Sequence, residues 1–88
     1  MSFQNESAAE NYEERRQAEL LLIRARRNED TYAWWKEETD PYLKASYAEC
    51  YREEVGVHPE RRDQLLNALS AIQKGRRLSV ESVLSQLR

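Results

Sequence analysis

Residues 31–51 read TYAWWKEETDPYLKASYAECY, and six of the chain's eight aromatic side chains lie in this stretch. The same stretch holds the clearest helix start of the sequence, because Thr39 and Asp40 stand directly before Pro41. Aspartate is a good N-cap residue, and proline is well suited to the first helical position. We therefore predict two helices that meet near Asp40 and carry aromatic side chains on both sides of the turn.

The composition favours helix throughout the chain. Only two glycines and two prolines occur among the 88 residues, whereas the abundant Ala, Leu, Glu, Arg and Gln favour helix. No segment shows the strict apolar–polar alternation of a half-buried strand. We predict an all-α fold, a single domain forming a small bundle of about four to five helices with a long N-terminal helix. The expected helices cover residues 7–38, 41–55, 59–74 and 79–87, and residues 1–6 are expected to be disordered.

The first helix carries a long-range repeat. Tyr12, Ile23 and Trp34 recur every eleven residues, and eleven residues at 100° each return to within about 20° of the same face. The three would then share one buried stripe of a single helix. A split with a cap at Asp30 is the alternative, because the arginines of segment 24–27 would suit a helix C-terminus. Neither glycine nor proline occurs there to end the helix, so the continuous helix is the favoured prediction.

The second helix is expected to bury one face and to end at a glycine. Leu43, Tyr47, Cys50 and Tyr51 fall at i, i+4, i+7 and i+8, which predicts that they form its inner face. Gly56 suits the left-handed position that follows a helix C-terminus.

Residues that favour helix ends also set the bounds of the two remaining helices. Pro59 begins the third, Gly75 follows its end, and Ser79 caps the fourth. The predicted apolar stripe of the third helix consists of Leu65, Leu66, Ala68, Leu69 and Ile72.

Residues 65–87, LLNALSAIQKGRRLSVESVLSQL, are similar to the first two helices of winged-helix domains, where an apolar helix, a glycine turn and a leucine-serine start recur. The resemblance covers about a quarter of the chain and implies a helical hairpin there. In such domains a recognition helix and a β-wing follow and contact the DNA. Because the sequence ends at Arg88, we expect this segment not to read DNA by itself.

Charge is unevenly distributed along the chain. The formal net charge is −2, with −5 in residues 1–54 and +3 in residues 55–88. The basic second part keeps nucleic-acid binding as the alternative function, although a nucleic-acid-binding domain usually has a clearly basic balance. The residues that would form this basic surface are Arg61, Arg62, Lys74, Arg76, Arg77 and Arg88.

The sequence contains no catalytic or metal motif. Cys50 and His58 are the single cysteine and the single histidine, and a nucleophilic pair would need them in contact with a third group to orient the base. No zinc spacing, calcium loop or phosphate-binding glycine loop is present. We predict that the protein is not an enzyme and that it uses no cofactor or metal.

The sequence also predicts a cytoplasmic location and no membrane association. The longest aliphatic run, Leu20–Ile23, is far too short to cross a bilayer. The N-terminus lacks a signal-peptide pattern. A single cysteine cannot form an internal disulfide, which is typical of proteins in reducing compartments.

Protein binding is the favoured function. Adjacent residues on a helix point about 100° apart, so Trp34 and Trp35 cannot easily enter one small core together, unless the bundle wraps one centrally and one at its rim. Exposed tryptophan and tyrosine next to arginine are typical of binding hot spots. The expected binding residues are the anchors Tyr32, Trp34, Trp35 and Tyr42, with Arg27 and Lys36 setting the orientation.

We therefore expect an inhibitor, adaptor or assembly factor that docks on a larger protein. Short chains without catalytic motifs are common among phage and mobile-element accessory proteins, which is the expected origin. A homodimer is a related expectation, because a long helix with apolar residues on two faces can pair with its own copy.

Overall fold

The computed structural model describes the backbone of residues 2–88 and the side chains of residues 12–88. All regular structure in this part of the chain is helical, so the predicted all-α fold is confirmed. The elements are α1 (Ser2–Arg27), α2 (Glu29–Glu37), α3 (Pro41–Val55), the short 3₁₀ helix η1 (Pro59–Arg61), α4 (Arg62–Gln73) and α5 (Val80–Leu87).

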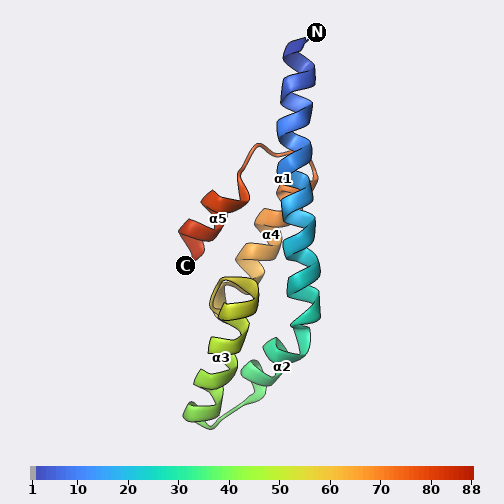
Figure 1. Cartoon of the computed structure of the whole chain (residues 1–88). Helices are drawn as coiled ribbons and strands as arrows, with labels where there is room; N and C mark the ends of the chain where they lie inside the picture. The colour runs from blue at the N-terminus through green and yellow to red at the C-terminus, as the bar shows by residue number, and fades with distance from the viewer. Residues whose placement is uncertain (1) are drawn as a thin grey trace.

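The helices form two neighbouring columns (Figure 1). α1 and α2 make one column, and α3, η1 and α4 follow one another along the other. α1 packs mainly on α4, α2 packs on α3, and α5 folds back along α4. The Cα trace measures 58 × 21 × 17 Å, so the molecule is elongated and α2 and α3 occupy one end of it.

The first column bends at Asn28, and the continuous helix predicted for residues 7–38 is therefore wrong. α1 ends at Arg27 and α2 begins at Glu29. Asn28 has φ −108° and ψ 17°, which departs from helical values. Its side-chain Nδ2 donates a hydrogen bond to the Arg24 carbonyl at 2.9 Å. Because this amide satisfies a carbonyl at the end of α1, asparagine ends the helix where neither glycine nor proline is present.

α1 also begins earlier than the sequence predicted. Its backbone is helical from Ser2 rather than from residue 7, the disorder expected for residues 1–6 stays a prediction, and Met1 lies outside the described residues. No glycine or proline occurs before Pro41, so the composition supplies no break in this segment.

The core lies where α1, α4, α5 and the end of α3 meet. The predicted stripe of α4 is confirmed, because Leu65, Leu69 and Ile72 are fully buried and Leu66 and Ala68 pack against the core. The buried apolar residues of the core are Ala18, Ala25, Tyr51, Val55, Val57, Leu65, Leu69, Ile72 and Val83.

The inner face of α1 differs from the predicted eleven-residue stripe. Tyr12 is 65% exposed and Trp34 is 53% exposed, whereas Ala18 and Ala25 are buried. Alanine brings a neighbouring helix closer than a large side chain would, because interaxial distance depends on the side chains at the contact. The bend at Asn28 then ends the common helix axis that the stripe required.

The inner face of α3 is also displaced from the prediction. Tyr51 is fully buried as expected, but Leu43 and Cys50 are exposed and Tyr47 is only partly buried. Ala48 is buried instead, three residues before Tyr51. α3 is therefore rotated so that its predicted apolar face is shared between the core and the surface.

The predicted caps are confirmed. The Asp40 carboxylate accepts a hydrogen bond from the Tyr42 N–H at 2.9 Å, and Ser79 Oγ accepts one from the Ser82 N–H at 3.0 Å. Gly56 has φ 99°, a left-handed value that favours glycine after a helix.

Candidate functional site: the two faces of the α2–α3 hairpin

α2 and α3 form a helical hairpin, residues 29–55, at one end of the molecule (Figure 1). The turn between them is short because Asp40 caps α3 and Pro41 opens it. The Asp40 N–H donates in turn to Glu38 Oε1 at 3.2 Å, which ties the end of α2 to the start of α3. This local chemistry sets the two helices side by side and gives the hairpin an inner and an outer aromatic group.

The inner group faces the rest of the bundle. The Tyr32 ring lies 5.9 Å from the Trp35 ring and 6.1 Å from the Tyr51 ring, centroid to centroid. The Trp35 ring meets His58 edge-on at 5.6 Å. Lys44 Nζ lies 4.8 Å from the Trp35 centroid, a cation–π contact. Trp35 therefore connects α2 to α3 and to the turn before η1.

Arg62 joins this inner group to α4. Its guanidinium carbon lies 4.4 Å from the Tyr32 ring centroid, and it pairs with the carboxylates of Glu29 and Asp63. The hydrogen bond that the Arg62 guanidinium donates to the Glu29 carboxylate raises the pKa of Arg62 above its ordinary value. The contact reaches across the bend at Asn28 and fixes α2 against the start of α4.

Tyr51 is the buried end of the inner group. Its ring is fully buried, and its hydroxyl lies near Arg62 without a hydrogen bond of ordinary geometry to any described residue. Burial raises the pKa of the Tyr51 hydroxyl to about 12, and the nearby Arg62 charge opposes part of that rise. A phenol that is both buried and unpaired acts as core packing here, because water and substrate cannot reach it.

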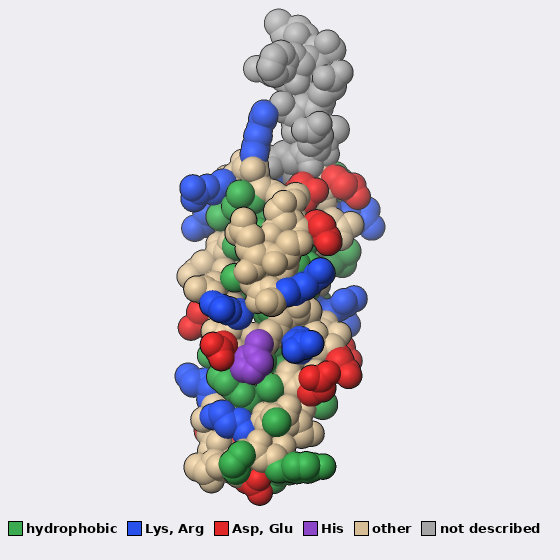
Figure 2. Space-filling model, turned by 90° about the vertical axis from the view of Figure 1, so that its left-hand side faces the viewer, with side chains coloured by type: hydrophobic (Ala, Val, Ile, Leu, Met, Phe, Trp, Pro, Cys, Tyr) green, Lys and Arg blue, Asp and Glu red, His purple; other side chains and the backbone are tan. Residues whose placement is uncertain are grey.

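The outer group faces solvent. The Trp34 ring packs on the Tyr47 ring at 5.9 Å, yet 53% of Trp34 and 43% of Leu43 remain exposed. Leu43 and Cys50 lie four residues before and three residues after Tyr47, and therefore on its side of α3. Figure 2 views the molecule from the side on which His58 (purple) lies, and hydrophobic side chains are exposed there too, at the lower end that holds the hairpin.

Acidic side chains border this apolar centre. Asp30 and Glu37 lie four residues before and three residues after Trp34 on α2, and Glu54 lies seven residues after Tyr47 on α3. All three are exposed, and their spacing places them on the same side of each helix as the two rings. We name as the outer face the seven residues Asp30, Trp34, Glu37, Leu43, Tyr47, Cys50 and Glu54.

The predicted binding residues do not form one surface, because only Trp34 belongs to the outer face and Tyr42 and Arg27 belong to neither group. Tyr32 and Trp35 belong to the inner group, and Lys36 Nζ lies 5.6 Å from the Tyr32 centroid. Tyr42 is 82% exposed at the start of α3. Arg27 is exposed at the end of α1, with no ring contact or ion pair among the described residues. The expectation that one tryptophan lies outside the core is confirmed, but the exposed one is Trp34, which the repeat had placed inside.

The outer face contains residues that sequence reasoning missed. Leu43, Tyr47 and Cys50 were assigned to the core because they are the apolar members of a helical repeat. The competing repeat of Ala48, Tyr51 and Val55 is the buried one. Ala48 and Val55 lie seven residues apart on the same side of α3. Small side chains favour close packing of helices, so this pair could have indicated the inner face.

The basic residues of the nucleic-acid alternative do not form one surface. Arg61 and Arg62 lie at the start of α4, whereas Lys74 follows its end, and Arg76 and Arg77 lie beyond it. Twelve residues separate the two groups along α4, a distance of about 18 Å at 1.5 Å per residue. Arg62 is also held by two carboxylates.

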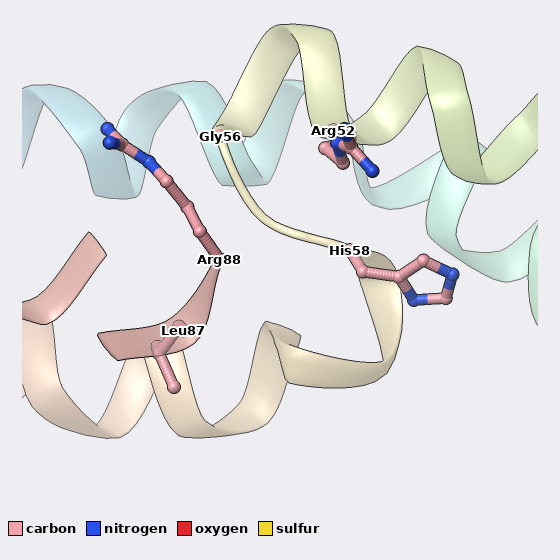
Figure 3. A pocket seen from close by; sticks show the side chains of 5 residues that line it. All are labelled: Arg52, Gly56, His58, Leu87 and Arg88. Atoms are coloured by element: carbon pink, nitrogen blue, oxygen red, sulfur yellow. The ribbon is translucent and has the colours of Figure 1, made fainter. Parts of the chain in front are cut away.

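Arg88 lines a different hollow, of about 550 Å³, together with Arg52, Gly56, His58 and Leu87 (Figure 3). The side chains of Arg52, His58 and Arg88 point in different directions in this view. The imidazole Nδ1 accepts the Glu60 N–H at 3.1 Å, so His58 serves as a cap of η1. The hollow has positive side chains at its rim, but they do not converge on a common centre.

The described side chains include neither a contact between Cys50 and His58 nor a cluster of metal-ligand residues. His58 belongs to the inner group and Cys50 to the outer face, so the structure does not bring them together. Within residues 12–88, no three His, Cys, Asp or Glu side chains gather as metal ligands would. Among the described residues, none of the helices is both long and apolar enough to span a membrane.

Comparison with known proteins gives no further information on the function of the chain. No family model, no curated protein and no solved structure matches the chain.

Proposed function

We propose that the chain is a small protein-binding module, acting as an inhibitor, adaptor or assembly factor, and that it docks on a larger protein through the outer face. One observation carries the proposal. Trp34 leaves 53% of its surface exposed while its ring packs on Tyr47. A monomeric protein usually covers a side chain this large, whereas tryptophan and tyrosine are enriched at the centres of protein interfaces.

The packing of the outer group supports tight docking. Binding immobilises side chains, and each ordered side chain costs about 0.5–1.5 kcal/mol of affinity. The contact between Trp34 and Tyr47 already restricts both rings in the isolated chain. Leu43 extends the apolar centre by one turn of α3. A partner would therefore meet a preorganised apolar centre whose ordering cost has been met on folding.

We also propose a location and an origin for the protein, and we rank nucleic-acid binding as the alternative function. We propose a cytoplasmic protein, since the single cysteine, Cys50, is exposed and free and such thiols persist in reducing compartments. An origin among phage or mobile-element accessory proteins stays a prediction. Nucleic-acid binding is the weaker alternative, because its basic residues lie at separate places along the molecule.

The test is a quantitative pull-down with matched variants. The immobilised wild-type chain, Trp34→Ala and Tyr12→Ala are compared on the same cell extract, with bound proteins measured by mass spectrometry. Tyr12 is also an exposed aromatic residue, but it lies on α1. We expect a protein that the wild type and Tyr12→Ala retain and Trp34→Ala loses, while all three have the same helical circular dichroism. Equal retention by the two variants would overturn the proposal.

A further inference from the structure

The charge of the hairpin narrows the kind of partner that the outer face can accept. Residues 29–55 contain eight acidic and three basic side chains, a balance of −5. Two of the three cations, Lys36 and Lys44, already lie over aromatic rings of the inner group. The third, Arg52, lines the hollow near Arg88 and is not part of the outer face. The outer face itself therefore carries acidic side chains and no basic one.

Resting on the proposed function, we propose that the outer face binds an amphipathic helix with basic side chains at the border of its apolar stripe. Asp30, Glu37 and Glu54 border the apolar centre, and opposite charges at the border of an interface favour the correct partner and repel the wrong one. Nucleic acid and anionic membrane surfaces carry the same sign as this face, so it repels both.

The shape of the face favours a helix over an extended segment. α2 and α3 are packed side by side and offer no strand edge for a peptide to extend. Along α3 the face runs from Leu43 to Glu54, about 16 Å at 1.5 Å per residue. A helix of about three turns covers that length and presents apolar anchors at i, i+3, i+4 and i+7. Trp34 stands beside this stripe through its contact with Tyr47.

The test uses two synthetic probes and the intact chain. One probe is an amphipathic helix of leucine and lysine, and the other has glutamate in place of every lysine. Affinity is measured by calorimetry at low and at moderate salt. We expect the lysine probe to bind at least tenfold more tightly than the glutamate probe, and to weaken as salt screens the border charges. Trp34→Ala is expected to lose this binding while keeping its helicity.

Charge-reversal variants locate the effect on the outer face. Glu37 and Glu54 lie near the C-terminal ends of α2 and α3, where lysine suits the helix dipole and should be tolerated. The double variant Glu37→Lys with Glu54→Lys should lower the affinity for the lysine probe roughly tenfold, since two border attractions become repulsions. Glu13→Lys with Glu19→Lys changes the net charge by the same amount on α1 and should bind like the wild type.

Each of the following results would overturn this inference. They are equal binding of the two probes, equal weakening by both double variants, preferred binding to phosphatidylserine vesicles, and a dimer in light scattering that Trp34→Ala dissociates. The last result would show that a second copy occupies the face. If the lysine probe fails to bind while pull-downs still depend on Trp34, only the basic-helix inference fails and the proposed function stands.

Discussion

Truncation of the two adjacent tryptophans should have unequal effects on stability. Trp34 is 53% exposed, so of the roughly 250 Å² that a tryptophan can bury, folding covers about 120 Å². At about 25 cal/mol per Å² this area is worth about 3 kcal/mol. The extended-chain reference overstates burial by roughly 10–40%, so we expect Trp34→Ala to cost about 2 kcal/mol.

Trp35→Ala should cost about 4 kcal/mol, as truncation of a well-packed tryptophan generally does. Trp35 is mostly buried, and its truncation also removes the edge contact with His58 and the cation–π contact with Lys44. The assay is urea unfolding followed by circular dichroism at low temperature. The difference of about 2 kcal/mol corresponds to roughly 8–16 °C in Tm for a domain of this size. If Trp34→Ala proves as destabilising as Trp35→Ala, the division into inner and outer groups is refuted.

Three further predictions concern the parts that hold the hairpin in place. Asp40→Ala should lower the free energy of unfolding by about 1 kcal/mol, because the Tyr42 N–H loses its cap; Asp40→Asn should retain nearly all of it in the same urea titration. Gly56→Ala should cost about 1–2 kcal/mol from backbone strain at φ 99°, since the added Cβ would lie at an ordinary 3.5 Å from Leu84 Cδ2; a neutral result contradicts the left-handed cap. Tyr51→Phe should be neutral or stabilising by up to about 1 kcal/mol at pH 7, because its buried hydroxyl has no partner. The folded chain keeps the Tyr51 proton up to about pH 12, whereas the unfolded chain loses it near pH 10. Wild-type stability should therefore fall relative to Tyr51→Phe as the pH rises from about 10 to 12, and parallel curves over that range would contradict the buried environment.

Local chemistry made the ends of the helices predictable. Aspartate before proline, glycine after a helix, and serine before a short apolar helix each satisfy backbone groups within a few residues. Asp40, Gly56 and Ser79 therefore behave in the structure as their sequence context predicts. The stripe of α4 was predictable because its apolar residues all fall on one face of the helix, so no second apolar face competed for burial.

The assignment of the aromatic side chains depended on tertiary packing, which the sequence pattern does not contain. Asn28 ends α1 through its own side-chain hydrogen bond, a weaker signal than glycine or proline. Trp34 lies beyond this bend and is exposed. On α3 two helical repeats compete, and burial of Ala48 in place of Cys50 follows from how closely the neighbouring helices approach. The exposed aromatic residues thus lie in the segment that the sequence singled out, with the inner and outer members partly exchanged, and their role in binding stays a prediction.

The position of Cys50 allows the docking proposal to be tested directly. It is the single cysteine, it is exposed, and it belongs to the outer face. A benzophenone maleimide is attached to Cys50, and a control carries the same group at Ser85→Cys on α5 in a Cys50→Ser chain. Illumination in cell extract should give one protein adduct of discrete size from Cys50, and none from position 85. Excess unlabelled wild type should suppress the adduct, whereas excess Trp34→Ala should not. Equal adducts from both positions, or suppression by Trp34→Ala, would contradict docking through the outer face.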